Sequence, residues 1–112
     1  MRIPARRPIR RVDRAVLGRA ADIIKLLGHR ERLTILEALE PGERTVTEIC
    51  RICRLPQAIC SQHLRRLRQL DVVACRKEGQ NVYYRVIEPR VKPILGCIRA
   101  SNAKPRRRRF HF

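Results

Sequence analysis

Acidic residues, long apolar runs and glycine are all scarce in this 112-residue chain. Ten Asp and Glu stand against 27 Lys and Arg, and the net charge of +17 favours polyanions such as nucleic acid as partners. No apolar run approaches the roughly 18 residues of a membrane span. The basic start of the chain is not followed by the apolar stretch of a secretory signal. We therefore expect a cytoplasmic protein with no membrane contact.

Signatures of catalysis are missing as well. The five glycines form no phosphate-binding loop, and the sequence contains no Ser/His/Asp set or paired carboxylates of a catalytic site. The sequence therefore predicts a protein that does no covalent chemistry. The five cysteines are an odd number, and in a reducing compartment they start as thiols.

The positive charge gathers at both ends of the chain. Residues 1–14 carry a net charge of +5, and residues 100–112 again carry +5. Each end has too few apolar residues to fold alone. We predict one domain over residues 15–101, between a basic N-terminal arm and a basic C-terminal tail at residues 102–112. A domain this small gains apolar burial by forming a dimer.

Apolar residues recur at helical spacing in the first part of the chain. This pattern predicts a helix over residues 15–27 that ends at Gly28. It predicts a second helix through residues 33–39, which ends at the turn-forming pair Pro41 and Gly42.

A capping box and a proline delimit two further helices. Thr45 and Glu48 have the spacing at which each side chain caps the backbone N–H of the other, so a short helix starts there and continues through Cys53. Pro56 suits the first position of a fourth helix, which we expect from about residue 57 to residue 70. The stripe of this helix that we expect to be buried contains Cys60, Leu64 and Leu67.

Beyond the fourth helix the apolar pattern changes to strict alternation, which is typical of strands. Residues 72–77 and 81–87 are predicted to be strands, joined by a hairpin loop at residues 78–80. Val82, Tyr84 and Val86 share one face of the second strand.

A fifth helix is expected from residue 89 to about residue 101. Pro93 and Gly96 stand inside it and both disfavour helix, so we expect it to start late or to bend. The element order is four helices, two strands and one helix. The predicted fold class is mainly α with a small β-hairpin.

The third and fourth helices, joined by a three-residue break, form a helix-turn-helix, and the basic hairpin after them forms a wing. On these features the chain resembles the ArsR/SmtB family of winged helix-turn-helix regulators. The matching stretches cover most of residues 16–87 and read IIKLLGHRERLTILEAL, TVTEICRICRLPQAICSQHLRRLRQLDVV and CRKEGQNVYYRV. The resemblance implies a homodimeric repressor that sits on a near-palindromic operator in double-stranded DNA. It also implies release by an inducer that is a metal, a metalloid or a thiol-reactive species.

The resemblance further implies that the N-terminal half of the fourth helix enters the major groove. The matching base-facing positions are Gln57, Ser61 and Gln62, since Gln reads adenine bidentately and Ser serves several bases. His63 is expected to be structural rather than a ligand. Positions suited to phosphate contacts, on the helix and on the wing, are Arg65, Arg66, Arg76, Lys77 and Gln80.

In that family the first and last helices form the dimer interface. A two-fold dimer predicts operator half-sites about one helical turn apart. The apolar residues of this chain available for the interface are Val16, Ala20, Ile23, Ile24, Leu27, Ile94, Leu95 and Ile98.

The cysteine cluster of the arsenite-sensing members is not reproduced, because only Cys50 keeps sulfur among the three matching positions. What remains is Cys50 and Cys53, one helical turn apart, which could bind a thiophilic metal or metalloid ion or react with a thiol-modifying inducer. For Cys60 and Cys75 we expect core packing instead.

Two other functions stay open on the sequence alone. A basic nucleic-acid-binding protein without an inducer would bind with a steep salt dependence and little sequence preference. A zinc-stabilised interaction module built on Cys50, Cys53, Cys60 and Cys75 would unfold when a chelator removes the metal.

Overall fold

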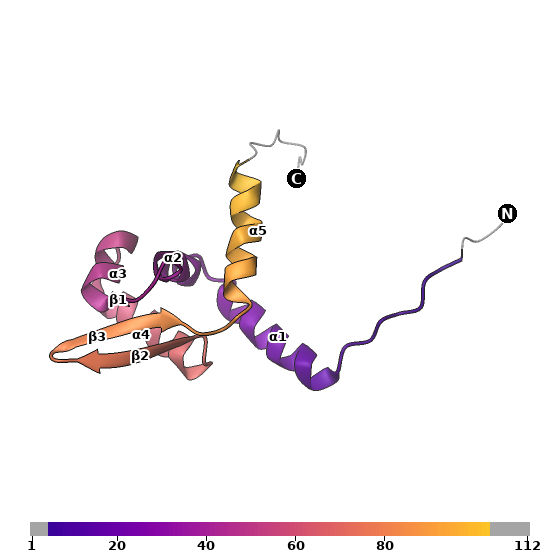
Figure 1. The fold of residues 1–112 in the computed structure, drawn as a ribbon, viewed down its shortest axis with the longest axis horizontal. Helices are drawn as coiled ribbons and strands as arrows, with labels where there is room; N and C mark the ends of the chain where they lie inside the picture. Colours follow the sequence, from indigo (N-terminus) through magenta and orange to yellow (C-terminus); the bar gives the residue numbers. More distant parts are fainter. Residues whose placement is uncertain (1–4, 104–112) are drawn as a thin grey trace.

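The computed structural model describes residues 5–103, which form five helices and a small antiparallel sheet (Figure 1). No helix among these residues is long and apolar enough to cross a membrane. The elements are α1 (Arg14–Leu27), α2 (Arg30–Leu39), β1 (Arg44–Thr45), α3 (Val46–Cys53), α4 (Gln57–Gln69), β2 (Val73–Glu78), β3 (Asn81–Val86) and α5 (Val91–Ala103).

The order of helices and hairpin agrees with the prediction, and the helix ends have the expected causes. The Asp13 side chain caps α1 by accepting a hydrogen bond from the N–H of Ala15 at 2.8 Å. The Thr45 and Glu48 capping box at the start of α3 is confirmed, with N–H to side-chain oxygen distances of 2.8 and 3.2 Å. Pro56 is the N-cap of α4 and lies just before the helix, not at its first position as predicted.

The sheet has the strand order β1-β3-β2 and contains one strand that the sequence did not reveal. β1 is only two residues long and pairs with β3, too short for an alternating pattern to show. The predicted three-residue hairpin loop is one residue shorter in the structure, because Glu78 pairs with Asn81. Gly79 adopts the positive φ of 62° that the tight turn requires.

One apolar core joins the helices to the inner face of the hairpin. The predicted stripe of α4 is confirmed, since Cys60, Leu64 and Leu67 are all fully buried. Full burial of an aliphatic side chain contributes about 1.5–3 kcal/mol, so this stripe fixes α4 firmly against the body of the domain. The rest of the core cluster is Ile23, Leu26, Leu27, Ile35, Leu36, Leu39, Ile49, Val72, Val73, Val91 and Leu95.

The last helix begins at Val91, two residues later than predicted, and then continues unbroken to Ala103. Pro93 is its third residue, where a backbone N–H has no acceptor within the helix, so the missing donor costs little. At Gly96 nothing lies within 4 Å of where a Cβ would be, so this residue is not needed for a close approach.

The predicted arm and tail are described only in part. Residues 5–13 form no helix or strand and are exposed, but Arg14 belongs to α1. Residues 102 and 103 belong to α5, and the basic run after them lies outside the described residues.

Candidate nucleic-acid interface

The turn between α3 and α4 is tight because of one residue in the left-handed region. Arg54 has φ 55° and ψ 46°, and its N–H donates to the carbonyl of Cys50. The N–H of Leu55 donates to the same carbonyl at 3.1 Å. A left-handed Arg costs about 1–2 kcal/mol, and the helix-turn-helix packing around Ile49 and Cys60 offsets that cost.

The side of α4 opposite the buried stripe is polar and available for contacts. Gln57 and Gln62 are exposed and Ser61 is half-buried. None of the three side chains makes a hydrogen bond within residues 5–103. Arg65 is exposed and has no ion-pair partner in the same range, whereas Arg66 donates to the side chain of Gln69 at 3.3 Å. The predicted base-facing residues therefore lie on one helix with Arg65 and Arg66, while the third wing residue, Gln80, is exposed in the hairpin turn.

Of the two predicted cations on the wing, Arg76 is paired with carboxylates and is not free as expected. Arg76 makes hydrogen bonds from Nε and Nη2 to the carboxylate of Glu43, at 2.8 to 3.1 Å, and its guanidinium also pairs with Glu78. It lies 4.7 Å above the ring of Tyr83. Hydrogen bonds from Arg76 lower the pKa of the Glu43 carboxyl, which stays ionised and holds this guanidinium. Lys77 is exposed with no such partner in the described range.

Sequence reasoning missed the partner of Arg76 because Glu43 is 33 residues away in the chain. It also missed further exposed cations beside α4. Arg51 and Arg54 are both exposed near the start of this helix. The break Arg54-Leu55-Pro56 in the sequence predicted a turn, but it did not indicate that Arg54 would be an exposed cation beside α4.

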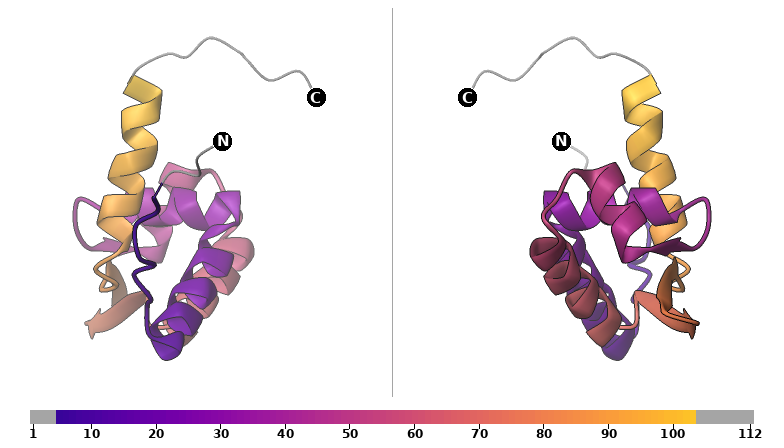
Figure 2. Two further views of the ribbon diagram at one scale, coloured as in Figure 1. Left: turned by 90° about the vertical axis from the view of Figure 1, so that its right-hand side faces the viewer. Right: turned by 90° about the vertical axis from the view of Figure 1, so that its left-hand side faces the viewer.

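The molecule has two distinct ends along its long axis (Figure 1). α3 and the hairpin tip lie at one end, α5 rises near the middle, and α1 runs from there toward residues 5–13 at the other end. The start of α5 packs on the core, and its C-terminal part extends beyond the other helices (Figure 2). The tip of the wing is thus separated from the helices predicted to form the dimer interface. The end of α4 lies beside α1, where Arg19 donates to the carbonyl of Leu70 at 3.0 Å.

The apolar residues predicted for the dimer interface divide between core and surface. Ile23, Leu27 and Leu95 are buried within the core of the single chain, so they stabilise the fold before any partner arrives. The other five keep surface for a second copy: Val16, Ile24 and Ile98 are 46%, 65% and 50% exposed, and Ala20 and Ile94 are half-buried.

The cysteines gather more closely than their spacing alone indicates. Cys50 and Cys53 are half-buried on α3, and Cys60 is fully buried on α4 against them. Burial, with added effects from Cys50 and then Cys53, raises the pKa of the Cys60 thiol to about 12. Burial, followed by Cys50 and Glu37, raises the pKa of Cys53 as well. Cys53 and Cys60 are therefore held as thiols, whereas metal ligation and nucleophilic attack need thiolates.

Alkylation tests this picture of the thiols. At pH 8, iodoacetamide should modify the exposed Cys97 first and Cys60 last in the native protein. The raised pKa of Cys60, about 12 against an ordinary 9.0, leaves it with far less thiolate than an ordinary cysteine, and burial also restricts access of the reagent. Peptide mass spectrometry over time gives the order, and all five thiols should react alike in denaturant. Equal native rates at Cys60 and Cys97 would contradict the buried environment.

His63 follows the predicted base-facing pair on α4 and is half-buried. Burial lowers its pKa, and the neighbouring His29 lowers it further. The imidazole of His63 is therefore neutral near pH 7.

A helix-turn-helix with a polar second helix and a basic hairpin after it defines a winged helix-turn-helix DNA-binding regulator. The family model for "Bacterial regulatory protein, arsR family" matches residues 29–74. A helix-turn-helix transcriptional regulator of Methanocaldococcus jannaschii is 38% identical over 81 residues, which cover 71% of this chain and 91% of that protein. The chain belongs to the ArsR/SmtB family of transcriptional regulators. Family membership confirms the predicted fold class and the prediction that the chain is not an enzyme.

Other relatives and solved structures agree. The transcriptional repressor PagR of Bacillus anthracis is 34% identical over 67% of this chain and 76% of its own length. The structure of HlyU from Vibrio cholerae superposes with a TM-score of 0.75 at 29% identity, covering 82% of this chain and 100% of that one. A winged helix-turn-helix domain from Mycobacterium bovis, described as homodimeric, gives a TM-score of 0.70 at 29% identity over 83% of this chain and 88% of that one.

Proposed function

We propose that this chain is a sequence-specific transcriptional repressor that binds a near-palindromic operator as a homodimer. The observation that carries the proposal is the free polar face of α4, where Gln57, Ser61 and Gln62 have no hydrogen-bond partner within residues 5–103. In the major groove each Gln can bond an adenine edge in two places. A regulator of chromosomal genes acts in the cytoplasm, so that is where we place it.

The homodimer presents two copies of α4 to one duplex. Exposed Val16, Ile24 and Ile98 on α1 and α5 supply the apolar surface for it, and the M. bovis domain of the same fold is described as homodimeric. Two-fold symmetry of the dimer then requires two half-sites of inverted sequence, about 10–10.5 base pairs apart from centre to centre.

We propose repression and not activation because the relative PagR is named a transcriptional repressor. HlyU of V. cholerae, 35% identical over 70% of this chain, is named an activator, so the sign of regulation needs its own assay.

The inducer part of the proposal rests on Cys50 and Cys53. These two thiols lie against Cys60, near the start of α4. A metal, a metalloid or a thiol-reactive species bound there would therefore contact the helix proposed to read DNA and could shift it. A thiophilic ion displaces the thiol protons as it binds, which overcomes the raised pKa of Cys53 at a cost in affinity. If Cys50→Ser with Cys53→Ser leaves operator release unchanged for every effective inducer, this part of the proposal is wrong.

Selection from a random duplex library tests the proposed function. The full chain should enrich one inverted repeat, and a promoter carrying that repeat should be silenced when the chain is expressed. Recovery of unrelated sequences with equal affinity would instead indicate a non-regulatory basic protein, which the net charge of +17 alone would support. Unfolding on chelation, with no DNA enriched, would indicate a zinc-stabilised module.

The two wing cations should differ in their effect on DNA binding. Lys77→Ala removes one free phosphate contact from each chain of the dimer, so the slope of log K against log salt should become shallower by about 1.8. Arg76→Ala should leave this slope unchanged, because Glu43 and Glu78 already neutralise the guanidinium. Affinity measurements over a salt series check both variants. Equal slope changes would show that Arg76 leaves its carboxylates to contact phosphate.

A further inference from the structure

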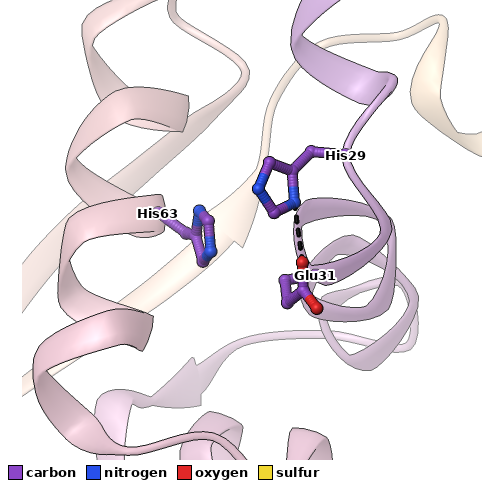
Figure 3. A group of neighbouring side chains, drawn as sticks. All are labelled: His29, Glu31 and His63. Carbon is purple, nitrogen blue, oxygen red and sulfur yellow. Dashed lines mark ion pairs between the residues drawn. The ribbon is translucent and has the colours of Figure 1, made fainter.

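Three metal-ligating side chains come together away from the cysteines (Figure 3). His29 and Glu31 stand at the start of α2, and His63 reaches toward them from the middle of α4. Nδ1 of His29 lies 2.8 Å from Oε1 of Glu31, and the two imidazole centroids are 4.7 Å apart with an interplanar angle of 64°. One ligand atom from each residue lies within 4.8 Å of the other two. Across residues 5–103 no other set of three such residues gathers this closely.

We propose that His29, Glu31 and His63 bind a divalent transition-metal ion of the zinc class. Two imidazoles and a carboxylate form a ligand set that such ions accept, with the fourth position open to water. This site differs in place and in chemistry from the Cys50 and Cys53 pair. It also does not depend on the proposed function, because binding of the ion is measured without DNA.

The geometry needs only small side-chain rotations. Ligand atoms around a tetrahedral zinc ion lie about 3.3 Å apart, given metal–ligand distances near 2.05 Å. The pair of His29 and Glu31 would open by about 0.5 Å, and the widest separation of 4.8 Å would close by about 1.5 Å. The terminal torsions of His and Glu have broad minima, so these changes cost little.

The fold makes little other use of these side chains. His29 occupies the N-cap of α2, yet its side chain makes no capping hydrogen bond to that helix. No hydrogen bond or ion pair to the His63 side chain is formed within the described range. The side chains of His29 and Glu31 are 44% and 38% exposed, so an ion can enter from solvent.

A bound ion would tie the start of α2 to the middle of α4, two segments far apart in the chain. Because the unfolded chain does not preform the site, the binding free energy adds to folding stability. At a zinc concentration 100-fold above the dissociation constant, the melting temperature should rise on the order of 10 °C.

Titration of the metal-free, reduced full chain tests the proposal, with Zn²⁺ in calorimetry and Co²⁺ in absorption spectroscopy. In the chain with Cys50→Ser and Cys53→Ser, which lacks the cysteine pair proposed for the inducer, we expect one ion per chain and cobalt d–d bands without thiolate-to-cobalt charge transfer. His63→Gln should weaken binding more than about 100-fold, since loss even of a hydrogen-bond partner of a ligand costs about 10–100-fold. Glu31→Gln, which is near the surface and leaves both imidazoles in place, should weaken it at least about 10-fold. Circular dichroism confirms that each variant is folded.

Matched controls are Asp22→Asn on α1 and His111→Gln in the C-terminal tail, both made in the chain that lacks Cys50 and Cys53, and both should bind Zn²⁺ as that chain does. The proposal is overturned if the parent chain shows no saturable Zn²⁺ binding. In the chain that lacks Cys50 and Cys53, it is equally overturned if the cobalt spectrum shows thiolate charge transfer, if His111→Gln abolishes binding, or if folded Glu31→Gln and His63→Gln variants bind as tightly as without these changes.

Discussion

Replacing Gln57 and Ser61 together by alanine should weaken binding to the operator by at least about 30-fold, because each lost base contact costs about 1–3 kcal/mol. Both side chains lie on the face of α4 that the core leaves free, and neither helps to hold the fold by a hydrogen bond among the described residues. The loss should therefore appear in DNA recognition and not in stability. Affinity for the selected operator and for a scrambled duplex, measured at one salt concentration, gives the result.

The control for this variant exchanges the same residue types elsewhere. Gln69→Ala with Ser101→Ala changes one Gln at the far end of α4 and one exposed Ser on α5. It should keep the operator affinity within a few-fold of the parent. Affinity for the scrambled duplex should stay the same in all three proteins, since phosphate contacts supply it. An equal loss on both duplexes in the test variant would mean that these residues do not read bases.

Ile24→Asp should break the dimer and lower operator affinity on the order of 10²–10⁴-fold, because each half-site is then bound without the effective concentration that linkage provides. Ile24 is 65% exposed on α1, so the aspartate is solvated in the single chain and the fold is retained. In a dimer the same position would bury an unpaired charge. Sedimentation equilibrium measures the association, and the same samples report operator affinity.

Ile52→Asp is the matched control for the dimer variant. Ile52 is 49% exposed on α3, which lies on the other side of α2 from α1 and α5 (Figure 1). This variant should remain a dimer although it carries the same substitution. Dimers of undiminished stability with Ile24→Asp would contradict the placement of the interface on α1.

Local signals in the sequence predicted most of the fold. The Thr45 and Glu48 capping box fixes the start of α3, since both partners lie within one turn. The stripe of Cys60, Leu64 and Leu67 gives the buried face of α4, and thereby the exposed face as well. These are features in which residues a few positions apart determine each other.

The features that the sequence did not predict lie where segments far apart in the chain come into contact. Nothing near Arg76 in the sequence points to Glu43, and nothing near His63 points to His29. The helical period of α1 shows that one face is apolar, but not whether its partner is the chain's own core or a second copy. Ile23 and Ile24 are neighbours in one predicted interface, yet the first is 1% exposed and the second 65%.

Native mass spectrometry of the full chain on its selected operator, combined with affinity for a scrambled duplex, tests the central claim most directly. We expect two chains on each operator and an affinity at least about 10³-fold above that for the scrambled duplex. One chain per duplex would contradict the homodimer. Variable numbers of chains per duplex, with equal affinity for both sequences, would contradict the claim that the two copies of α4 read bases.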